Sequence, residues 1–138
     1  MNTRLPTMQE IEALLAFLPR LQAQKCGLVQ RWHDGSLQTQ DAILVSFTPV
    51  YSDVVRDFFR IAAGECWMDR DYQPEEAGRM LDDHEAVRNA DLARIRTMLT
   101  YCVRGERFCD GHWAAMIRDG HIARLLERLA EIKSGMTA

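Results

Sequence analysis

The chain has little of anything that would mark a specialised protein. Among its 138 residues are four cysteines and four prolines, aromatic residues make up 8%, and the net charge is −3. These values lie near those of ordinary soluble chains and give no case for a disordered, collagen-like or membrane protein. A chain of this length can bury a core without disulfides or a structural metal. We therefore expect one helical domain over residues 1–138.

Long apolar runs are also missing, so no segment is expected to span a bilayer. The short apolar run at residues 13–18 directly follows Glu10 and Glu12, and no small-residue cleavage site comes after it. This pattern is not that of a signal peptide, and we expect a cytoplasmic protein. In a reducing compartment the cysteines should remain thiols. The four are Cys26, Cys66, Cys102 and Cys109.

The best-known catalytic and cofactor motifs are absent. The sequence has no Gly-x-Ser-x-Gly elbow, no glycine-rich phosphate loop, no dinucleotide fingerprint and no His-Glu-x-x-His helix. The acidic residues at 69–71 and 82–85 lack the glycine and glutamate spacing of a calcium loop and are interpreted as solvated loops. We therefore expect no cofactor and favour a protein that is not an enzyme.

Apolar spacing predicts an all-α fold of about six helices around one core. Thr7 and Glu10 form a capping-box pattern before a first helix that should end at Pro19. Gly105 and Gly120 are expected to end later helices in left-handed geometry. The other predicted helices cover residues 49–63, 74–81, 91–104, 110–120 and 121–133. Two short segments rich in β-branched and aromatic residues predict a small β-hairpin within residues 28–47.

The predicted second helix has an unusually wide apolar face. It is expected to follow Thr48 and Pro49, and from Val50 to Ala62 its apolar residues cover about half of the circumference. Either the neighbouring segment 28–32 covers the surplus, or a second copy of the chain does. The second possibility predicts a homodimer with Phe59 at its contact.

One stretch resembles a known family. Residues 104–112 read Arg-Gly-Glu-Arg-Phe-Cys-Asp-Gly-His, and residues 119–122 read Asp-Gly-His-Ile. This stretch is similar to the signature of a small bacterial family of unknown function, DUF6508. The resemblance implies a bacterial cytoplasmic setting and carries no activity or site residue. Independently of it, Gly111 would allow a tight entry into the helix that follows.

Cys102, Cys109, His112 and His121 are the candidate metal ligands. Cys109 and His112 lie three residues apart, and a turn at Gly120 could bring His121 back toward them. Zinc prefers such nitrogen and sulfur ligands in sets of four. However, none of the paired spacings typical of zinc sites occurs, and each residue also fits a core or cap position. We therefore expect no metal.

Cys109 is also a candidate nucleophile. It lies near a predicted helix N-terminus and close to Arg107, and both favour a thiolate. Phe108 and Trp113 indicate burial instead, and Asp110 opposes the charge. Burial is the interpretation we prefer, with further core positions predicted in the C-terminal helix pair. The expected core residues there are Phe108, Trp113, Ile117, Ile122, Leu125 and Leu129.

The C-terminal helix pair superficially resembles a DNA-binding helix-turn-helix. Its second helix should present Arg124, Glu127, Arg128 and Glu131 outward. Alternating charges are typical of a solvated face, and carboxylates would be repelled by phosphates, so nucleic-acid binding is disfavoured. The sequence thus favours a non-catalytic interaction or ligand-binding module. The alternatives are a helix-turn-helix DNA-binding protein and a metal- or thiol-dependent enzyme using Cys109, His112 and His121.

Overall fold

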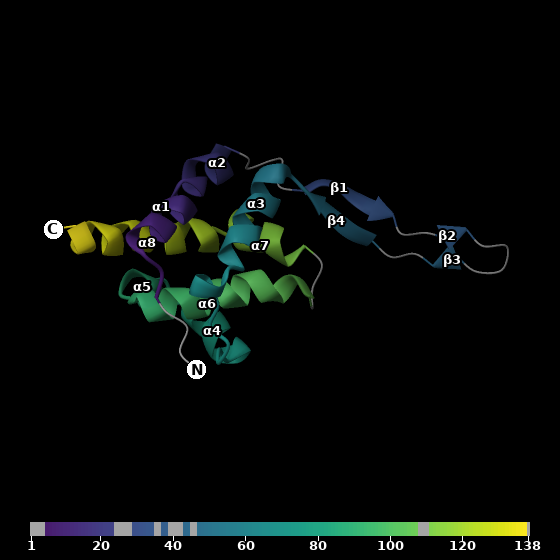
Figure 1. Cartoon of the computed structure of the whole chain (residues 1–138). Helices are drawn as coiled ribbons and strands as arrows, with labels where there is room; N and C mark the ends of the chain where they lie inside the picture. Colours follow the sequence, from purple (N-terminus) through teal and green to yellow (C-terminus); the bar gives the residue numbers. More distant parts are fainter. Residues whose placement is uncertain are drawn as a thin grey trace.

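A computed structural model describes residues 5–23, 29–34, 37–38, 43–44, 47–107 and 111–137. Within these ranges, eight α-helices form the body of the molecule, and paired strands lead away from one side of it (Figure 1). The helices are α1 Met8–Leu15, α2 Phe17–Ala23, α3 Asp53–Ala62, α4 Pro74–Asp82, α5 His84–Arg88, α6 Leu92–Arg104, α7 His112–Arg118 and α8 His121–Thr137. The strands are β1 Val29–Asp34, β2 Leu37–Gln38, β3 Ile43–Leu44 and β4 Phe47–Tyr51, and the 3-10 turns are η1 Glu65–Trp67 and η2 Gly105–Arg107. The helical fold class is confirmed.

The capping box at the first helix is confirmed. The Glu10 backbone N–H donates to Thr7 Oγ1 at 3.3 Å, and the Thr7 N–H donates to Glu10 Oε1 at 2.9 Å. The predicted single helix is instead two, because α1 ends at Leu15 and α2 begins at Phe17. Pro19 is the third residue of α2, in a first turn where its missing N–H leaves no intrahelical bond unmade.

The strand pairing is longer than expected. β1 pairs antiparallel with β4, with Trp32 opposite Pro49 and Asp34 opposite Phe47, and β2 pairs with β3. The helix start predicted at Thr48 and Pro49 is therefore wrong. A two-stranded ladder leaves one edge of each strand unpaired and so tolerates a proline. The true N-cap is Ser52, whose hydroxyl accepts from the Val55 N–H at 3.4 Å.

The core is built around α8, which packs against α1, α2, α5, α6 and α7. In Figure 1 this helix runs through the middle of the body. Its residues Ile122, Leu125 and Leu129 are buried as predicted. Trp113 and Ile117 are only partly buried, and Phe108 lies outside the described residues. Of the described helices, none is both long enough and apolar enough to cross a membrane.

The wide apolar face of α3 is covered within the chain. Phe58 meets Phe17 of α2 edge to face at 5.7 Å between ring centroids, and Phe59 stacks on Trp113 of α7 at 4.5 Å. Because Phe59 is only 1% exposed, it is not available to a second chain, and the expected dimer contact there is wrong. Helices α2 and α7 therefore cover this face at Phe58 and Phe59, and the side chains of segment 28–32 lie outside the described residues.

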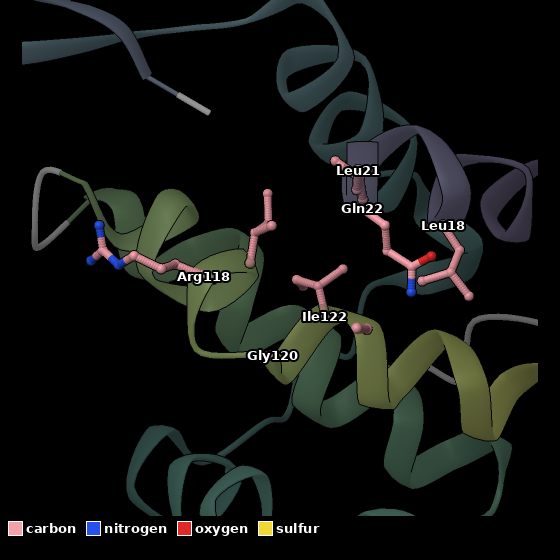
Figure 2. Close-up of a pocket in the computed structure, with 8 residues that line it drawn as sticks. Leu18, Leu21, Gln22, Arg118, Gly120 and Ile122 are labelled. Atoms are coloured by element: carbon pink, nitrogen blue, oxygen red, sulfur yellow. The ribbon is translucent and has the colours of Figure 1, made fainter. Parts of the chain in front are cut away.

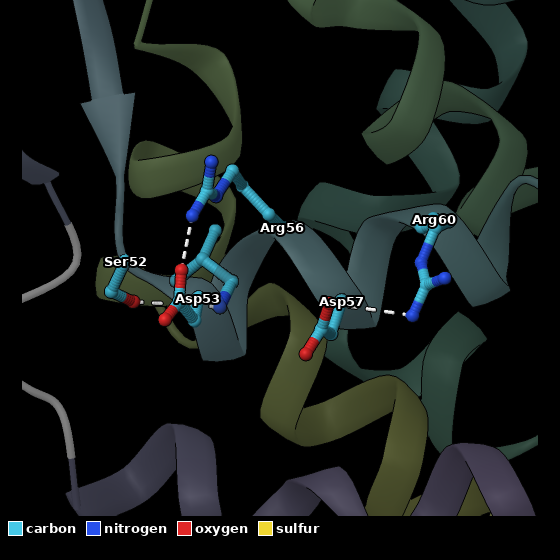
Figure 3. Close-up of polar contacts among 6 residues, drawn as sticks. Ser52, Asp53, Arg56, Asp57 and Arg60 are labelled. Carbon is cyan, nitrogen blue, oxygen red and sulfur yellow. Dashed lines mark hydrogen bonds and ion pairs between the residues drawn. The ribbon is translucent and has the colours of Figure 1, made fainter.

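The outward face of α3 is polar, as predicted. Asp53 pairs with Arg56, and Asp57 pairs with Arg60 at 3.4 Å, so both pairs join residues three apart along the helix (Figure 3). Such exposed pairs contribute little to stability, about 0.2–1 kcal/mol. This face is a solvated helix surface.

Two acidic segments carry local hydrogen bonds: residues 69–71 lie in a loop as expected, whereas residues 82–85 lie where α4 meets α5 and are not the expected loop. Asp83 is the N-cap of α5, a helix that the sequence pattern missed, and its carboxylate accepts from the N–H groups of Glu85 and Ala86. The Asp69 carboxylate accepts from the Thr97 hydroxyl at 2.6 Å and from the Asp71 N–H at 3.0 Å. Short acidic side chains favour such bonds to nearby backbone groups.

Glycine geometry differs from the prediction at one of three positions. Gly111 and Gly120 are left-handed, with φ of 88° and 84°, and they bound α7. Gly111 is also the N-cap of that helix, a place predicted for Asp110, which lies outside the described residues. Gly105 has φ of −61°, so the expected left-handed cap is wrong there. The chain continues from α6 directly into η2 because Gly105 stays in right-handed geometry.

Candidate functional site

The predicted metal and thiol residues do not form one cluster in the part that is described. His112 lies at the start of α7 against Tyr101, whereas His121 starts α8 with Nε2 3.8 Å from Asp82 Oδ1. Cys102 is fully buried in α6, and burial raises the pKa of its thiol far above the ordinary value. Cys109 lies outside the described residues. No group of three or more metal-ligating side chains occurs among those described.

His121 is held in one orientation by charged neighbours. Arg124 Nη2 lies 2.9 Å from His121 Nδ1, and because arginine only donates, Nδ1 is the acceptor. Nε2 then carries the proton and faces Asp82. Burial, followed by the charge of Arg124, lowers the pKa of His121 below its ordinary value. The ring is therefore neutral near pH 7 and joins the α7–α8 turn to α4.

His112 is positioned by packing. Its ring lies against Gly105, where an added Cβ would be 2.3 Å from His112 Nε2, and its edge meets Tyr101 at 5.3 Å between ring centroids. Burial lowers the pKa of His112. Among the described residues, its buried Nε2 has no hydrogen-bond partner. The close approach of the ring to the backbone thus explains why position 105 is a glycine.

The Glu106 carboxylate links separate parts of the chain through hydrogen bonds, a role that was not predicted from the sequence. Its Oε1 accepts from the Tyr51 hydroxyl at 2.7 Å and from the Trp113 N–H at 2.8 Å, and its Oε2 accepts from the Gly111 N–H at 3.0 Å. Burial and then the bond to Glu106 raise the pKa of Tyr51. One carboxylate therefore joins β4 to the first turn of α7, whose N–H groups have no partners within the helix. An acidic residue shortly before a glycine-led helix is the signal that could have found it.

Trp113 completes this junction. Its indole Nε1 donates to the Val103 carbonyl at 2.9 Å, and one face of the ring stacks on Phe59. Tyr51 approaches it at 5.2 Å between ring centroids. These contacts fix α7 against α3 and α6. The Glu106 carboxylate accepts three hydrogen bonds in this structural role.

A pocket of about 430 Å³ lies between α2 and the α7–α8 turn (Figure 2). Four branched aliphatic side chains line it, and the polar residues Gln22 and Arg118 lie among the lining residues at its two sides. The remaining lining residues are at the turn and the start of α8. The full described set is Leu18, Leu21, Gln22, Ile117, Arg118, Gly120, Ile122 and Ala123. Sites for small molecules are typically about 300–1,000 Å³ and mostly apolar, and this pocket has both properties.

This pocket could not be predicted from the sequence because its lining residues are the same aliphatic types that fill the core. Leu18 and Leu21 come from α2 near one end of the chain, and Ile122 comes from α8 near the other. In Figure 2 the Ile122 side chain points toward α2, whereas Arg118 extends away from the aliphatic side chains. The left-handed turn at Gly120 places α7 and α8 on two sides of the same cavity.

The predicted helix-turn-helix pair corresponds to α7 and α8, joined at Gly120. α8 would be the recognition helix, but it contacts five other helices. Its arginines are bound within the chain: Arg128 Nε donates to the Ala90 carbonyl at 2.9 Å, and Arg124 donates to the Asp119 carbonyl at 3.3 Å. A recognition helix needs a long exposed face to enter a major groove.

These features define a helical protein with an aliphatic pocket beside its C-terminal helix pair. The chain belongs to DUF6508, a family of unknown function, whose family model matches residues 6–135. The resemblance based on residues 104–122 is thereby confirmed at the level of the family. No curated protein and no solved structure matches the chain.

Proposed function

We propose that the protein is a non-catalytic binding protein for a small, largely aliphatic molecule. The observation that carries this proposal is the pocket between α2 and the α7–α8 turn, whose volume of about 430 Å³ suits a small ligand. Leu21 and Ile122 are almost completely buried, while Leu18 and Ile117 are partly exposed. A ligand that covers Leu18 and Ile117 would remove apolar surface from water, which stabilises the complex by roughly 25 cal/mol per Å².

The alternatives have weaker support. For an enzyme, two of the described groups that could act as acid or base are engaged in holding the fold: Glu106 accepts three hydrogen bonds, and His121 contacts Arg124 and Asp82. For a DNA-binding protein, α8 packs against five other helices, and its Arg124 and Arg128 are hydrogen-bonded within the chain. A binding role needs no such group and uses a cavity that is already formed.

Binding of the neutral apolar fluorophore N-phenylnaphthylamine tests the proposal. The purified chain should increase the probe's emission in a saturable way with one site per chain. Ala123 lines the pocket and is partly exposed, so Ala123→Phe should fill the cavity and weaken binding at least tenfold while the helical circular dichroism is retained. Glu76→Phe adds the same ring at an exposed position of α4 and serves as the control.

Three results would count against the pocket. The first is an absence of saturable emission from the wild-type chain. The second is equal binding by wild type and Ala123→Phe, and the third is equal weakening by Glu76→Phe. If Ala123→Phe does not fold, the smaller change Ala123→Leu should still weaken binding by partly filling the same space.

A further inference from the structure

The charge at the edge of the pocket indicates the chemical class of its ligand. We propose that the ligand is an amphipathic carboxylate, with an unbranched aliphatic chain in the pocket and its carboxylate at the mouth beside the Arg118 guanidinium. This inference rests on the proposed function and adds the ligand's charge to it. Arg118 is an exposed pocket residue at the end of α7, and its side chain extends outward in Figure 2.

Arg118 differs from the arginines of the nearest polar helix face. Arg56 and Arg60 of α3 form ion pairs with Asp53 and Asp57. By contrast, Arg118 has no ion pair or hydrogen bond with any part of the chain that the structure describes. A cation with no partner among the described residues, at the rim of an apolar cavity, attracts an anionic group while the rest of the ligand leaves water.

The surroundings of Arg118 strengthen the preference for an anion. Gly120, Ile122 and Ala123 place the first turn of the 17-residue helix α8 at the pocket, and the N-terminal end of a helix carries partial positive charge. This end adds to the field of Arg118 but is not needed for the assignment.

The lining determines what kind of anion fits. Leu18, Leu21, Ile117 and Ile122 are branched aliphatic residues, and none of the described lining residues is aromatic, so the apolar part of a ligand is held by burial against aliphatic groups rather than by ring stacking. A single guanidinium matches one carboxylate in a two-point contact. A phosphate carries more charge and is usually met by several donors. The amide of Gln22 is the other polar side chain of the lining, and it lies on the opposite side of the pocket from Arg118 (Figure 2).

Calorimetric titration with decanoate and with decanol, below their aggregation concentrations, tests the inference. Decanoate should bind more tightly than decanol, and Arg118→Gln should weaken decanoate by roughly threefold to fivefold at low salt while leaving decanol unchanged. Arg118→Lys should keep most of the preference. Arg60→Gln removes an exposed arginine of α3 and should have no effect. From octanoate to decanoate, each added methylene should strengthen binding by about fourfold until the pocket is full.

The possible failures are distinguishable. Equal binding of decanoate and decanol, or unchanged decanoate binding in Arg118→Gln, overturns the carboxylate assignment and leaves the aliphatic pocket in place. If neither ligand binds while N-phenylnaphthylamine does, the inference is also wrong and the pocket takes another class of apolar molecule. If N-phenylnaphthylamine does not bind either, the proposed function is wrong as well.

Discussion

Replacing Glu106 by alanine would remove one carboxylate that serves three donors from two separate parts of the chain. The Tyr51 hydroxyl would lose its acceptor although Tyr51 is only 4% exposed. The N–H groups of Gly111 and Trp113, at the start of α7, would lose theirs as well. We therefore expect Glu106→Ala to destabilise the fold far more than an ordinary surface substitution does.

The size of the effect follows from the two kinds of bond lost. Loss of an acceptor at a helix N-terminus costs about 1 kcal/mol. A buried hydroxyl left without a partner costs about 1–3 kcal/mol. Together these give a loss of about 2–4 kcal/mol in the free energy of unfolding. For a chain of this size that corresponds to a fall in Tm of roughly 8–16 °C.

Thermal and urea unfolding of four single variants and one double variant would test this value. Glu106→Gln keeps one carbonyl oxygen as an acceptor and should lose about half as much stability as Glu106→Ala. In a double-mutant cycle, Tyr51→Phe and Glu106→Gln should be coupled by at least about 0.5 kcal/mol. Glu127→Ala removes an exposed glutamate of α8 and should stay within about 0.5 kcal/mol of wild type. A Tm for Glu106→Ala within about 2 °C of wild type would refute the reasoning.

Three further predictions concern the residues around this junction. Gly105→Ala would place a Cβ 2.3 Å from His112 Nε2 and should lower the free energy of unfolding in urea by about 1–3 kcal/mol. Adding His112→Ala in the same chain should restore most of this loss. A Gly105→Ala variant as stable as wild type would contradict the packing. Trp113→Ala removes a partly buried ring stacked on Phe59 and should cost about 3 kcal/mol, and a melting temperature unchanged from wild type would count against it. Because burial lowers the pKa values of His112 and His121, the unfolded chain takes up protons at a higher pH than the folded chain does. The contribution of these two histidines to stability is therefore full above about pH 6.5 and should be lost as the pH falls through their folded pKa values. The double variant His112→Gln with His121→Gln should show a shallower loss of stability between about pH 7.5 and 5.5, and an identical pH profile would show that other groups are responsible.

Local signals in the sequence predicted most helix ends correctly. The side chains of Thr7 and Asp91 accept from the N–H groups of Glu10 and Arg94 at the starts of their helices. Gly120 has the left-handed geometry expected of a turn between two helices. These features depend on residues three or four positions apart, so they can be recognised without knowing the rest of the fold.

Errors arose where two local signals competed. Thr48 and Pro49 satisfy a helix start, but Ser52 offers a second one, and pairing with β1 decides in favour of the later residue. Phe59 shows a different limit. The wide apolar face of its helix was recognised, but the sequence did not indicate that α2 and α7 would cover it. Both outcomes depend on partners distant in the chain, which local patterns do not specify.

The candidate site could not be predicted from the sequence for the same reason. The carboxylate of Glu106 is distinguished only by its donors, and Tyr51 is 55 residues away from it in the chain. The pocket residues Leu21 and Ile122 look like ordinary core residues in the sequence and differ only in facing a cavity. The candidate ligands Cys109, His112 and His121, by contrast, were conspicuous because cysteine and histidine are rare. The rarity of a residue type is therefore not by itself evidence of a binding role.

The short helix α7 connects these two parts of the molecule physically. It has seven residues, too few for a helix to be stable by itself in water. Its first turn is held by Glu106, and the ring of Trp113 holds it against Phe59. Its other end supplies Ile117 and Arg118 to the pocket. The wall of the pocket therefore exists because contacts at the opposite end of α7 keep this segment helical, and the cavity is a product of the tertiary fold.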